Sequence, residues 1–298
     1  MNFLAPVFSR DGLKLFAVGE ERRGELVRYD AKAREFVPYL SGISADRLAF
    51  SRDGKWVTYV SYPDETLWRS KIDGGQKQQL TFPPSVVDSP EWSPDGRQIA
   101  FCASTESGTE NIYLISSEGG KSVEIAPGKQ RECYPSWSAD GDFLAFSGRE
   151  PGSAKSAIFV FSLETRAVSL LPGSEGLFDP RWSPDGKQIA AMSMDSQNLM
   201  LFEIQTQTWE RLAQIGIGYL SWSKDSNHLY FDTFGASPSF VRIGVRDRAV
   251  QKVVDFSGLH RAWGRYGPWS GLGPDDIPLE TRDAGIQEIY GSQWTESK

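Results

Sequence analysis

Histidine and cysteine are scarce in this chain of 298 residues, which contains two of each. A metal site built from several histidines is therefore impossible, and no CxxC pair is present that could form a zinc or redox centre of that kind. The motifs GxSxG, GxGxxG, HExxH and the P-loop are missing as well. We therefore predict that the chain is not an enzyme and that it uses neither a cofactor nor a metal.

An excess of positive charge and a long apolar run are also absent. The net charge is −7 and the isoelectric point is about 5.1, which argues against nucleic-acid binding because that needs a concentrated positive surface. No apolar stretch reaches 18 residues and the first residues do not resemble a signal peptide, so we predict no membrane insertion. The location stays open: extracytoplasmic if the chain is the C-terminal part of a membrane-anchored parent, otherwise cytoplasmic.

Helical periodicity is missing too, and a repeated turn takes its place. The segment WSPDG, or a variant of it, recurs seven times, with its aspartate at Asp11, Asp53, Asp95, Asp140, Asp185, Asp225 and Asp275. Successive aspartates are 42, 42, 45, 45, 40 and 50 residues apart. This period fits four short strands per unit, as in the blades of a propeller.

The spacing predicts an all-β fold, a seven-bladed β-propeller of four-stranded antiparallel blades. We expect blades to start near residues 5, 46, 88, 133, 178, 218 and 266, within a single domain over residues 1–298. A β-sandwich also uses many short strands, but it does not explain a repeat of about 43 residues. The repeated residues themselves read as structural: the aspartate fixes the turn, and the tryptophan or phenylalanine packs between sheets.

The last unit offers three strands and then ends, so its outer strand is missing. Three alternatives are open for this blade. Residues 1–4 close the ring weakly, an upstream segment of a longer parent protein supplies the missing strand, or the last blade stays incomplete. An open edge would favour association with other chains. We nevertheless expect a monomer. For Cys102 and Cys133 we favour two reduced, half-buried thiols over a disulfide between adjacent blades.

Three stretches, PEWSPDGRQIAF, DPRWSPDGKQIAA and YPSWSADGDFLAF, resemble the TolB-type propeller repeat, and the resemblance covers nearly the whole chain. The stretches LPGSEGLFDPRWSPDGKQIAA and RAWGRYGPWSGLGPDDIPLETRDAGIQEIY resemble the C-terminal propellers of acidobacterial winged-helix regulators and serine/threonine kinases more closely. This resemblance implies a sensory or interaction role within a larger signalling or regulatory protein. The turns WSKDSN and LGPDDI depart from the repeat, so the register of the last blades stays open.

Candidate binding residues follow from the face of a propeller at which the loops lead into each first strand, because loops on a rigid scaffold often bind ligands. Residues 260–269 are rich in arginine and aromatic side chains, the types that anchor interfaces. The candidates are Asp46, Arg47, Asp88, Tyr134, Asp179, Tyr219, His260, Arg261, Trp263 and Arg265. A calcium site among the three aspartates is an alternative to their capping turns.

Two functions remain open from the sequence. The first is a binding, interaction or sensor module that recognises a protein, peptide or small ligand at the channel mouth. The second is a propeller hydrolase that cleaves a glycan or peptide, for which two channel carboxylates must converge. We favour the binding module because no catalytic motif is present.

Overall fold

The structure is a computed structural model that describes residues 2–104, 108–125, 130–149, 152–235 and 237–293. Among these residues it contains 27 strands, and helix is confined to one 3-10 turn, η1 (Leu40–Gly42). No helix within the described ranges is long and apolar enough to cross a membrane. The chain is therefore all-β, as predicted.

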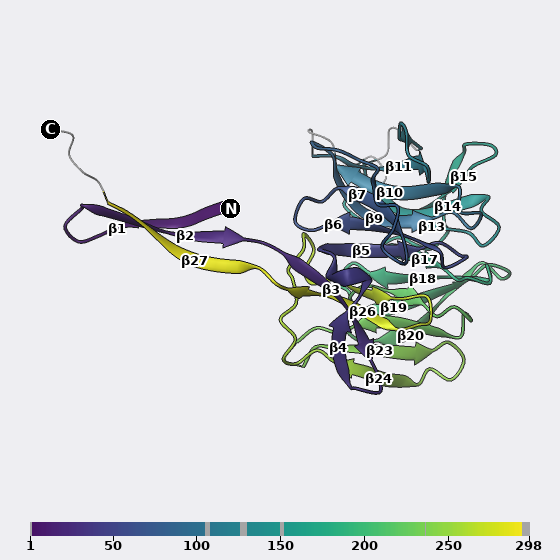
Figure 1. Cartoon of the computed structure of the whole chain (residues 1–298). Coiled ribbons are helices and arrows are strands. Elements are labelled where there is room, and N and C mark those ends of the chain that lie inside the picture. Colours follow the sequence, from purple (N-terminus) through teal and green to yellow (C-terminus); the bar gives the residue numbers. More distant parts are fainter. Residues whose placement is uncertain (1, 105–107, 126–129, 150–151, 236, 294–298) are drawn as a thin grey trace.

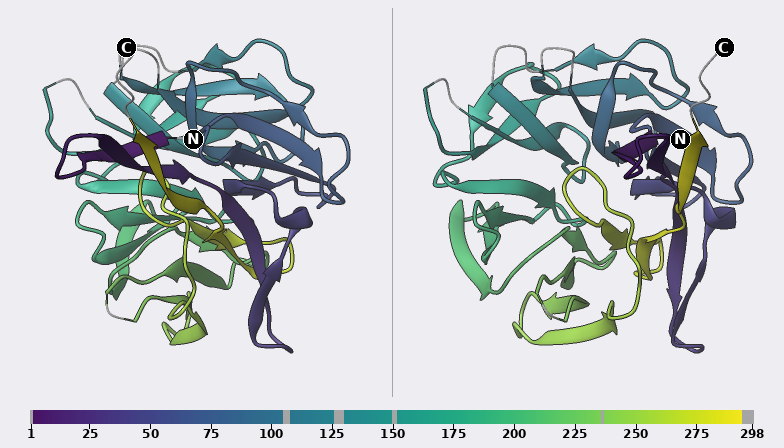
Figure 2. Two further views of the ribbon diagram at one scale, coloured as in Figure 1. Left: turned by 60° about the vertical axis from the view of Figure 1, so that its left-hand side comes forward. Right: turned by 90° about the vertical axis from the view of Figure 1, so that its left-hand side faces the viewer.

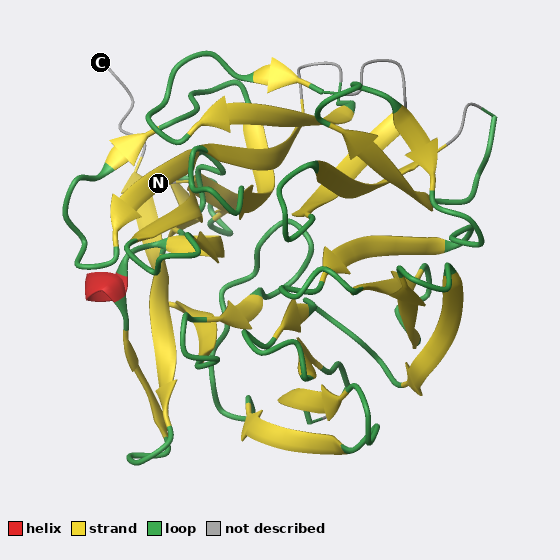
Figure 3. Ribbon diagram, turned by 90° about the vertical axis from the view of Figure 1, so that its right-hand side faces the viewer, coloured by secondary structure: helices red, strands yellow, loops and turns green. Residues whose placement is uncertain are grey.

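Six four-stranded antiparallel sheets form a ring, seen face on in Figures 2 and 3. The first sheet contains β5 (Ala45–Phe50), β6 (Trp56–Ser61), β7 (Leu67–Lys71) and β8 (Gln78–Gln79). The second contains β9 (Val86–Trp92), β10 (Gln98–Ser104), β11 (Glu110–Ser116) and β12 (Val123–Glu124). The third contains β13 (Gln130–Trp137), β14 (Phe143–Arg149), β15 (Ala157–Ser162) and β16 (Val168–Leu170). The fourth contains β17 (Leu177–Trp182), β18 (Gln188–Ser193), β19 (Asn198–Glu203) and β20 (Thr208–Gln214). The fifth contains β21 (Ser221–Trp222), β22 (His228–Asp232), β23 (Ser239–Gly244) and β24 (Val250–Asp255).

The sixth sheet closes the ring with strands from both ends of the described chain. Its order is β25 (Ser270–Leu272), β26 (Pro278–Asp283), β3 (Gly24–Asp30) and β4 (Glu35–Pro38). Strands β26 and β3 are antiparallel, with Leu279 opposite Arg28. The last blade is thus completed by N-terminal residues, as the fold prediction allowed, but by residues 24–38 and not by residues 1–4.

A seventh sheet has three strands and projects away from the ring, as Figure 1 shows at its left. Its order is β1 (Asn2–Phe8), β2 (Lys14–Glu21) and β27 (Ile286–Gln293), and we call this sheet the arm. The propeller fold with four-stranded blades and the total of seven sheets agree with the prediction. The seventh sheet departs from it, because the pairing of β3 with β26 leaves β2 to pair with β27 outside the ring.

The repeated turn forms as its chemistry predicts. In the second copy, Ser51 Oγ donates to Asp53 Oδ1 at 2.7 Å, and the backbone N–H of Lys55 donates to the same oxygen at 3.0 Å. Gly54 follows with a φ of 67°, which a residue without Cβ adopts at low cost. These hydrogen bonds favour the charged carboxylate and lower the pKa of Asp53, as they do at Asp95.

Tryptophans join neighbouring blades, which confirms their predicted packing role. Trp92 is buried in the cluster between the first two blades of the ring, and its indole N–H donates to the carbonyl of Ala49 at 3.1 Å. Trp137 donates in the same way to Glu91, and Trp222 to Arg181. Each bond links a strand β9, β13 or β21 to the first strand of the preceding blade, so the ring is held by both apolar burial and hydrogen bonds.

The two cysteines form a disulfide, and our preference for reduced thiols was wrong. Cys102 on β10 and Cys133 on β13 have Cα atoms 5.1 Å apart, and both residues are buried. The bond joins two adjacent blades. The two cysteines are 31 residues apart in the sequence, and this spacing alone does not predict that β10 and β13 lie next to each other.

Candidate functional site

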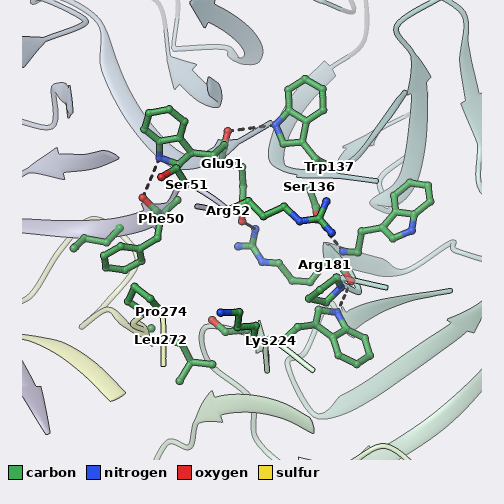
Figure 4. Close-up of a pocket in the computed structure, with 18 of the residues that line it drawn as sticks. Phe50, Ser51, Arg52, Glu91, Ser136, Trp137, Arg181, Lys224, Leu272 and Pro274 are labelled. Atoms are coloured by element: carbon green, nitrogen blue, oxygen red, sulfur yellow. Dashed lines mark hydrogen bonds and ion pairs between the residues drawn. The ribbon is translucent and has the colours of Figure 1, made fainter. Parts of the chain in front are cut away.

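A cavity of about 800 Å³ runs along the axis of the ring on the side that carries the Ser-x-Asp turns. First strands of all six blades line it. Figure 4 shows Arg52 and Arg181 pointing into it, with Glu91 and Lys224 at its wall. The guanidinium of Arg52 reaches the carbonyl of Ala139, two blades away, at 3.3 Å. Charged side chains therefore reach into a cavity of a size that takes a small ligand or a peptide side chain.

Arg47 forms the inner end of this cavity. Its side chain is 5% exposed, and its guanidinium lies 3.5 Å from Asp88 and 4.2 Å from the centre of the Tyr219 ring. The backbone of Arg47 has a φ of 51°, so the strand bulges here and turns the side chain towards the axis. Asp88 also accepts a hydrogen bond from Ser89 Oγ at 2.6 Å. The structure thus brings three predicted residues, Arg47, Asp88 and Tyr219, into one buried cluster.

Asp179 and Tyr134 lie beside this cluster, in the next two blades. Asp179 is 2% exposed and pairs with Arg181 at 2.9 Å, and Arg181 also reaches Glu91 at 3.3 Å. Burial raises the pKa of Asp179, although Arg181 opposes that effect. Burial likewise raises the pKa of Tyr134, whose ring packs against Phe178. Both predicted residues are thus fixed in place by their neighbours.

Residues 260–269 lie across the other end of the channel, where Figure 2 shows a yellow-green loop at the centre of the ring. The hydroxyl of Tyr266 donates to Glu110, and its carbonyl accepts from the hydroxyl of Tyr219 at 3.3 Å. Arg265 reaches Glu110 at 3.7 Å and Ser104 Oγ at 3.3 Å. The loop therefore closes the channel mouth at which the sequence analysis placed the ligand.

Trp263 stands on the outside of this loop and is 68% exposed. Its carbonyl accepts a hydrogen bond from Arg22 at 2.6 Å and a long one from the hydroxyl of Tyr62 at 3.5 Å, and Arg22 also lies over the Tyr62 ring. Trp263 contributes to two cavities, one of about 370 Å³ with Asp46 and Arg265, and one of about 590 Å³ with Arg261. An exposed indole with a fixed backbone thus lies beside two hollows.

Asp46 lines the smaller of these two cavities. Burial raises the pKa of this carboxyl to about 7, with Arg47 opposing the shift and Asp88 and Glu65 adding to it. In the described part of the chain, no three His, Cys, Asp or Glu side chains gather closely enough to hold a metal ion. Two of the predicted aspartates, Asp88 and Asp179, instead pair with Arg47 and Arg181.

Two candidates in the loop do not join the others. His260 is exposed, and its carbonyl accepts a hydrogen bond from the backbone of Asp283. The side chain of Arg261 is 9% exposed and lies between Glu280 at 2.8 Å and Asp232 at 3.2 Å, both fully buried. We predicted Arg261 as a binding residue, but its guanidinium is engaged by these two buried carboxyl groups. Its partners come from other strands, β22 and β26, which the loop sequence does not reveal.

Sequence reasoning missed several residues of the site. Arg181 lies two positions after Asp179 on β17, which bulges at Asp179, and the two side chains pair at 2.9 Å. The bulge interrupts the alternation of side chains along the strand, so the spacing in the sequence alone did not predict this pair. Arg22 and Tyr62 were not among the predicted binding residues, although Arg22 lies over the Tyr62 ring and donates to the carbonyl of Trp263. Glu110 was also missed, because it meets Tyr266 only through the tertiary fold.

Comparison with known proteins places the chain among propellers. The family model described as the TolB beta propeller domain matches residues 43–267. A Tol-Pal system protein TolB from Syntrophus aciditrophicus is 33% identical over 101 residues, which is 34% of this chain and 21% of that protein. The matched segment thus spans about a fifth of that relative's length.

Solved structures show the same architecture. A TolB-like protein of Agrobacterium tumefaciens superposes with a TM-score of 0.71 at 18% identity, over 88% of this chain and 99% of that one. TolB of Acinetobacter baumannii gives 0.61 at 19% identity, over 92% and 81%. An oligogalacturonate lyase in complex with manganese gives 0.58 at 12% identity, over 95% and 96%. At these identities the likeness shows the fold alone.

Proposed function

The chain belongs to the TolB β-propeller family, and on that premise we propose that it is a non-catalytic interaction module that binds a protein or peptide segment around Trp263. The exposure of Trp263 carries the proposal. Tryptophan is among the most frequent anchors of interfaces, and a large apolar side chain that is 68% exposed lacks the burial that usually stabilises it.

The surroundings of Trp263 support a peptide ligand. The adjoining hollow combines two cations, Arg22 and Arg265, with two carboxyl groups, Asp46 and Glu65. Such a pocket can pair with the amide groups and mixed charges of a peptide. We propose Trp263, Arg265 and Asp46 as contact residues.

The buried cluster serves as the rigid base of this surface. Arg47 stacks on Tyr219 and lies 5.7 Å from the ring of Tyr266, whose own loop carries Trp263 and Arg265. Asp88, Tyr134 and Asp179 add ion pairs and burial beneath it. We assign the predicted residues of this cluster a positioning role, because a preformed surface loses less entropy on binding.

Selection of random 12-residue peptides on the immobilised chain tests the proposal. Peptides enriched on the natural chain should bind it with micromolar Kd and lose at least tenfold affinity in Trp263→Ser. A matched control is Phe82→Ser, because Phe82 is similarly exposed, at 63%, and lines none of the three cavities described above. Its affinity should stay within twofold.

Other outcomes would reject the proposal. If Trp263→Ser and the natural chain bound the selected peptides with equal affinity, Trp263 would not be part of the binding site. If peptides instead lost affinity in Arg52→Ala or Lys224→Ala, the ligand would bind in the axial cavity on the opposite face. Failure to enrich any peptide would argue against peptide recognition by this chain.

The hydrolase alternative meets an obstacle in the axial cavity. Glu91, a carboxyl group in its wall, pairs with Arg181, which also pairs with Asp179. Burial raises the pKa of Glu91 although Arg181 opposes that effect, but glycoside cleavage also needs a second carboxyl group free to act, and the same arginine engages Asp179. We expect no turnover in a panel of glycosidase and peptidase substrates. Turnover that Glu91→Gln abolishes would replace the interaction module with an enzyme.

The disulfide supports an extracytoplasmic location, because such bonds persist in oxidising compartments. We propose that the propeller acts there as the sensory part of a larger signalling or regulatory protein. Thiol titration of the chain isolated from its source without reductant tests the location. Two free thiols per denatured chain would place it in the cytoplasm.

A further inference from the structure

The arm is built like a piece of a blade. Its first turn repeats the ring's hydrogen bonds: Ser9 Oγ donates to Asp11 Oδ1 at 2.6 Å, and the N–H of Leu13 donates to the same oxygen at 3.0 Å. Strand β1 bulges at Ala5, whose φ is 48°, as β5 does at Arg47. Strands β1, β2 and β27 thus occupy the first three positions of a blade, away from the ring.

The arm is also where apolar side chains are most exposed. Of sixteen large hydrophobic residues exposed in the described chain, the arm and its turn hold eight: Phe3, Leu4, Val7, Phe8, Leu13, Phe16, Ile286 and Ile289. Phe16 is exposed, whereas Ala100 and Ala190, at the same distance after their turns in the ring, are fully buried. Leu15 is half-buried, whereas Ile99 and Ile189, at the same distance after their turns, are fully buried. A sheet with this composition lacks the covering layer that blades give each other.

One face of the arm has an ordered pattern. Leu4, Val18 and Ile289 lie side by side across the three strands, so they share a face, and Val7 opposite Phe16 continues it. Along β2 the same face reads Lys14, Phe16, Val18 and Glu20 because alternate residues of a strand point to one side. The sequence of side chains is therefore basic at the tip, apolar in the middle and acidic next to the ring.

We propose that this face of the arm packs against the same face of a second copy, related by a two-fold axis near Ala17. Antiparallel arms then place Lys14 of one copy opposite Glu20 of the other at both ends, with Phe16 against Val18 between them. The pattern is self-complementary, which a closed two-fold dimer requires. The opposite face of β2 carries Leu15, Ala17, Gly19 and Glu21. It has an acidic residue at one end and no basic residue at the other, so it is not self-complementary in charge. The dimer replaces our expectation of a monomer.

Charge reversal tests the arrangement. We expect sedimentation equilibrium of the natural chain to show dimers at tens of micromolar. Lys14→Glu alone and Glu20→Lys alone should each raise the dimer Kd at least tenfold, because both ends then carry like charges. The double variant restores opposite charges and should return the Kd to within threefold. Ile289→Lys should also raise the Kd, since Ile289 is 79% exposed on the packed face.

The matched control is Glu288→Lys, an equal charge change on the opposite face, which should leave the Kd unchanged. Thermal unfolding of every variant should match the natural chain because the arm lies outside the ring. A monomer at all concentrations up to 200 µM, well above the expected range, would overturn the proposal. So would single variants that dimerise normally, or a double variant that does not recover.

Discussion

Loss of Arg261 should destabilise the ring strongly, and more at high pH than at low pH. Its guanidinium lies between Asp232 and Glu280, which are fully buried. Arg261→Met keeps an apolar stem of similar length but leaves two carboxyl groups without a cation. Breaking a buried ion pair from one side costs about 3–5 kcal/mol, so we expect that loss at pH 8.5. In a domain of this size it lowers the Tm by roughly 10 °C.

The pH dependence gives the sharper test. Burial raises the pKa of Glu280 from 4.5 to about 8, against the opposing effect of Arg261. Between these values the folded state holds a proton that the unfolded state releases, so this carboxyl group stabilises the fold at low pH and loses that effect as pH rises towards 8. Arg261→Met removes the opposing cation and raises this pKa further. Both chains therefore hold a neutral Glu280 at pH 5.5, where the loss should fall to about 1–3 kcal/mol, and only the natural chain ionises Glu280 at pH 8.5, where the loss is larger.

Urea unfolding followed by tryptophan fluorescence at pH 5.5 and 8.5 measures both quantities. Arg265→Met is the control, because Arg265 is 37% exposed in its pair with Glu110 and should lose less than about 1 kcal/mol at either pH. A loss for Arg261→Met that is equal at the two pH values would refute the assignment of buried, protonatable partners. A loss below about 1 kcal/mol at pH 8.5 would refute the burial itself.

Three further outcomes are expected. Reduction of Cys102–Cys133 should cost about 4 kcal/mol from the entropy of a 31-residue loop, seen as a Tm that falls with dithiothreitol in the natural chain and not in Cys102→Ser. Gly24→Ala should cost about 1–3 kcal/mol in urea unfolding, because its Cβ would lie 2.6 Å from Thr281 Cγ2 in the closing sheet; an unchanged midpoint would deny that pairing. Hydrogen bonds from Ser223 and Asn227 lower the pKa of Asp225 to about 2, so this carboxylate stabilises the fold above pH 4 and loses that effect below it. Asp225→Asn should therefore show a smaller loss of Tm between pH 4 and pH 2 than the natural chain.

Local chemistry explains which parts of the structure could be predicted. The turn aspartates act on the backbone two residues away, so Asp53 and Asp95 form the bonds that the sequence indicates in any fold that allows the turn. The repeat period then predicted four-stranded sheets, and the aromatic residue before each turn predicted packing between them. None of these inferences needed a contact between distant parts of the chain.

The remaining features depend on distant contacts. Arg261 and Arg265 look alike in the sequence, yet the first is buried and the second is half-exposed, because Asp232 and Glu280 come from strands that the fold brings beside only one of them. The disulfide depends on which faces of β10 and β13 meet. Trp263 and His260 are exposed while Arg261 between them is largely buried, and the loop sequence does not distinguish them.

The two copies of FSRDG show where local information ends. Their turns, at Asp11 and Asp53, have hydrogen bonds of nearly equal length, but the first lies in the arm and the second in the ring. The difference arises from the third strand. After β6 the chain turns back at once into β7, whereas after β2 it continues into β3, which pairs with β26. The free edge of β2 is left for β27. The first repeat therefore forms the arm because β3, which would be its third strand, completes the closing blade of the ring instead. The apolar side chains of the arm, which neighbouring blades would cover in the ring, are left exposed for contact with another surface.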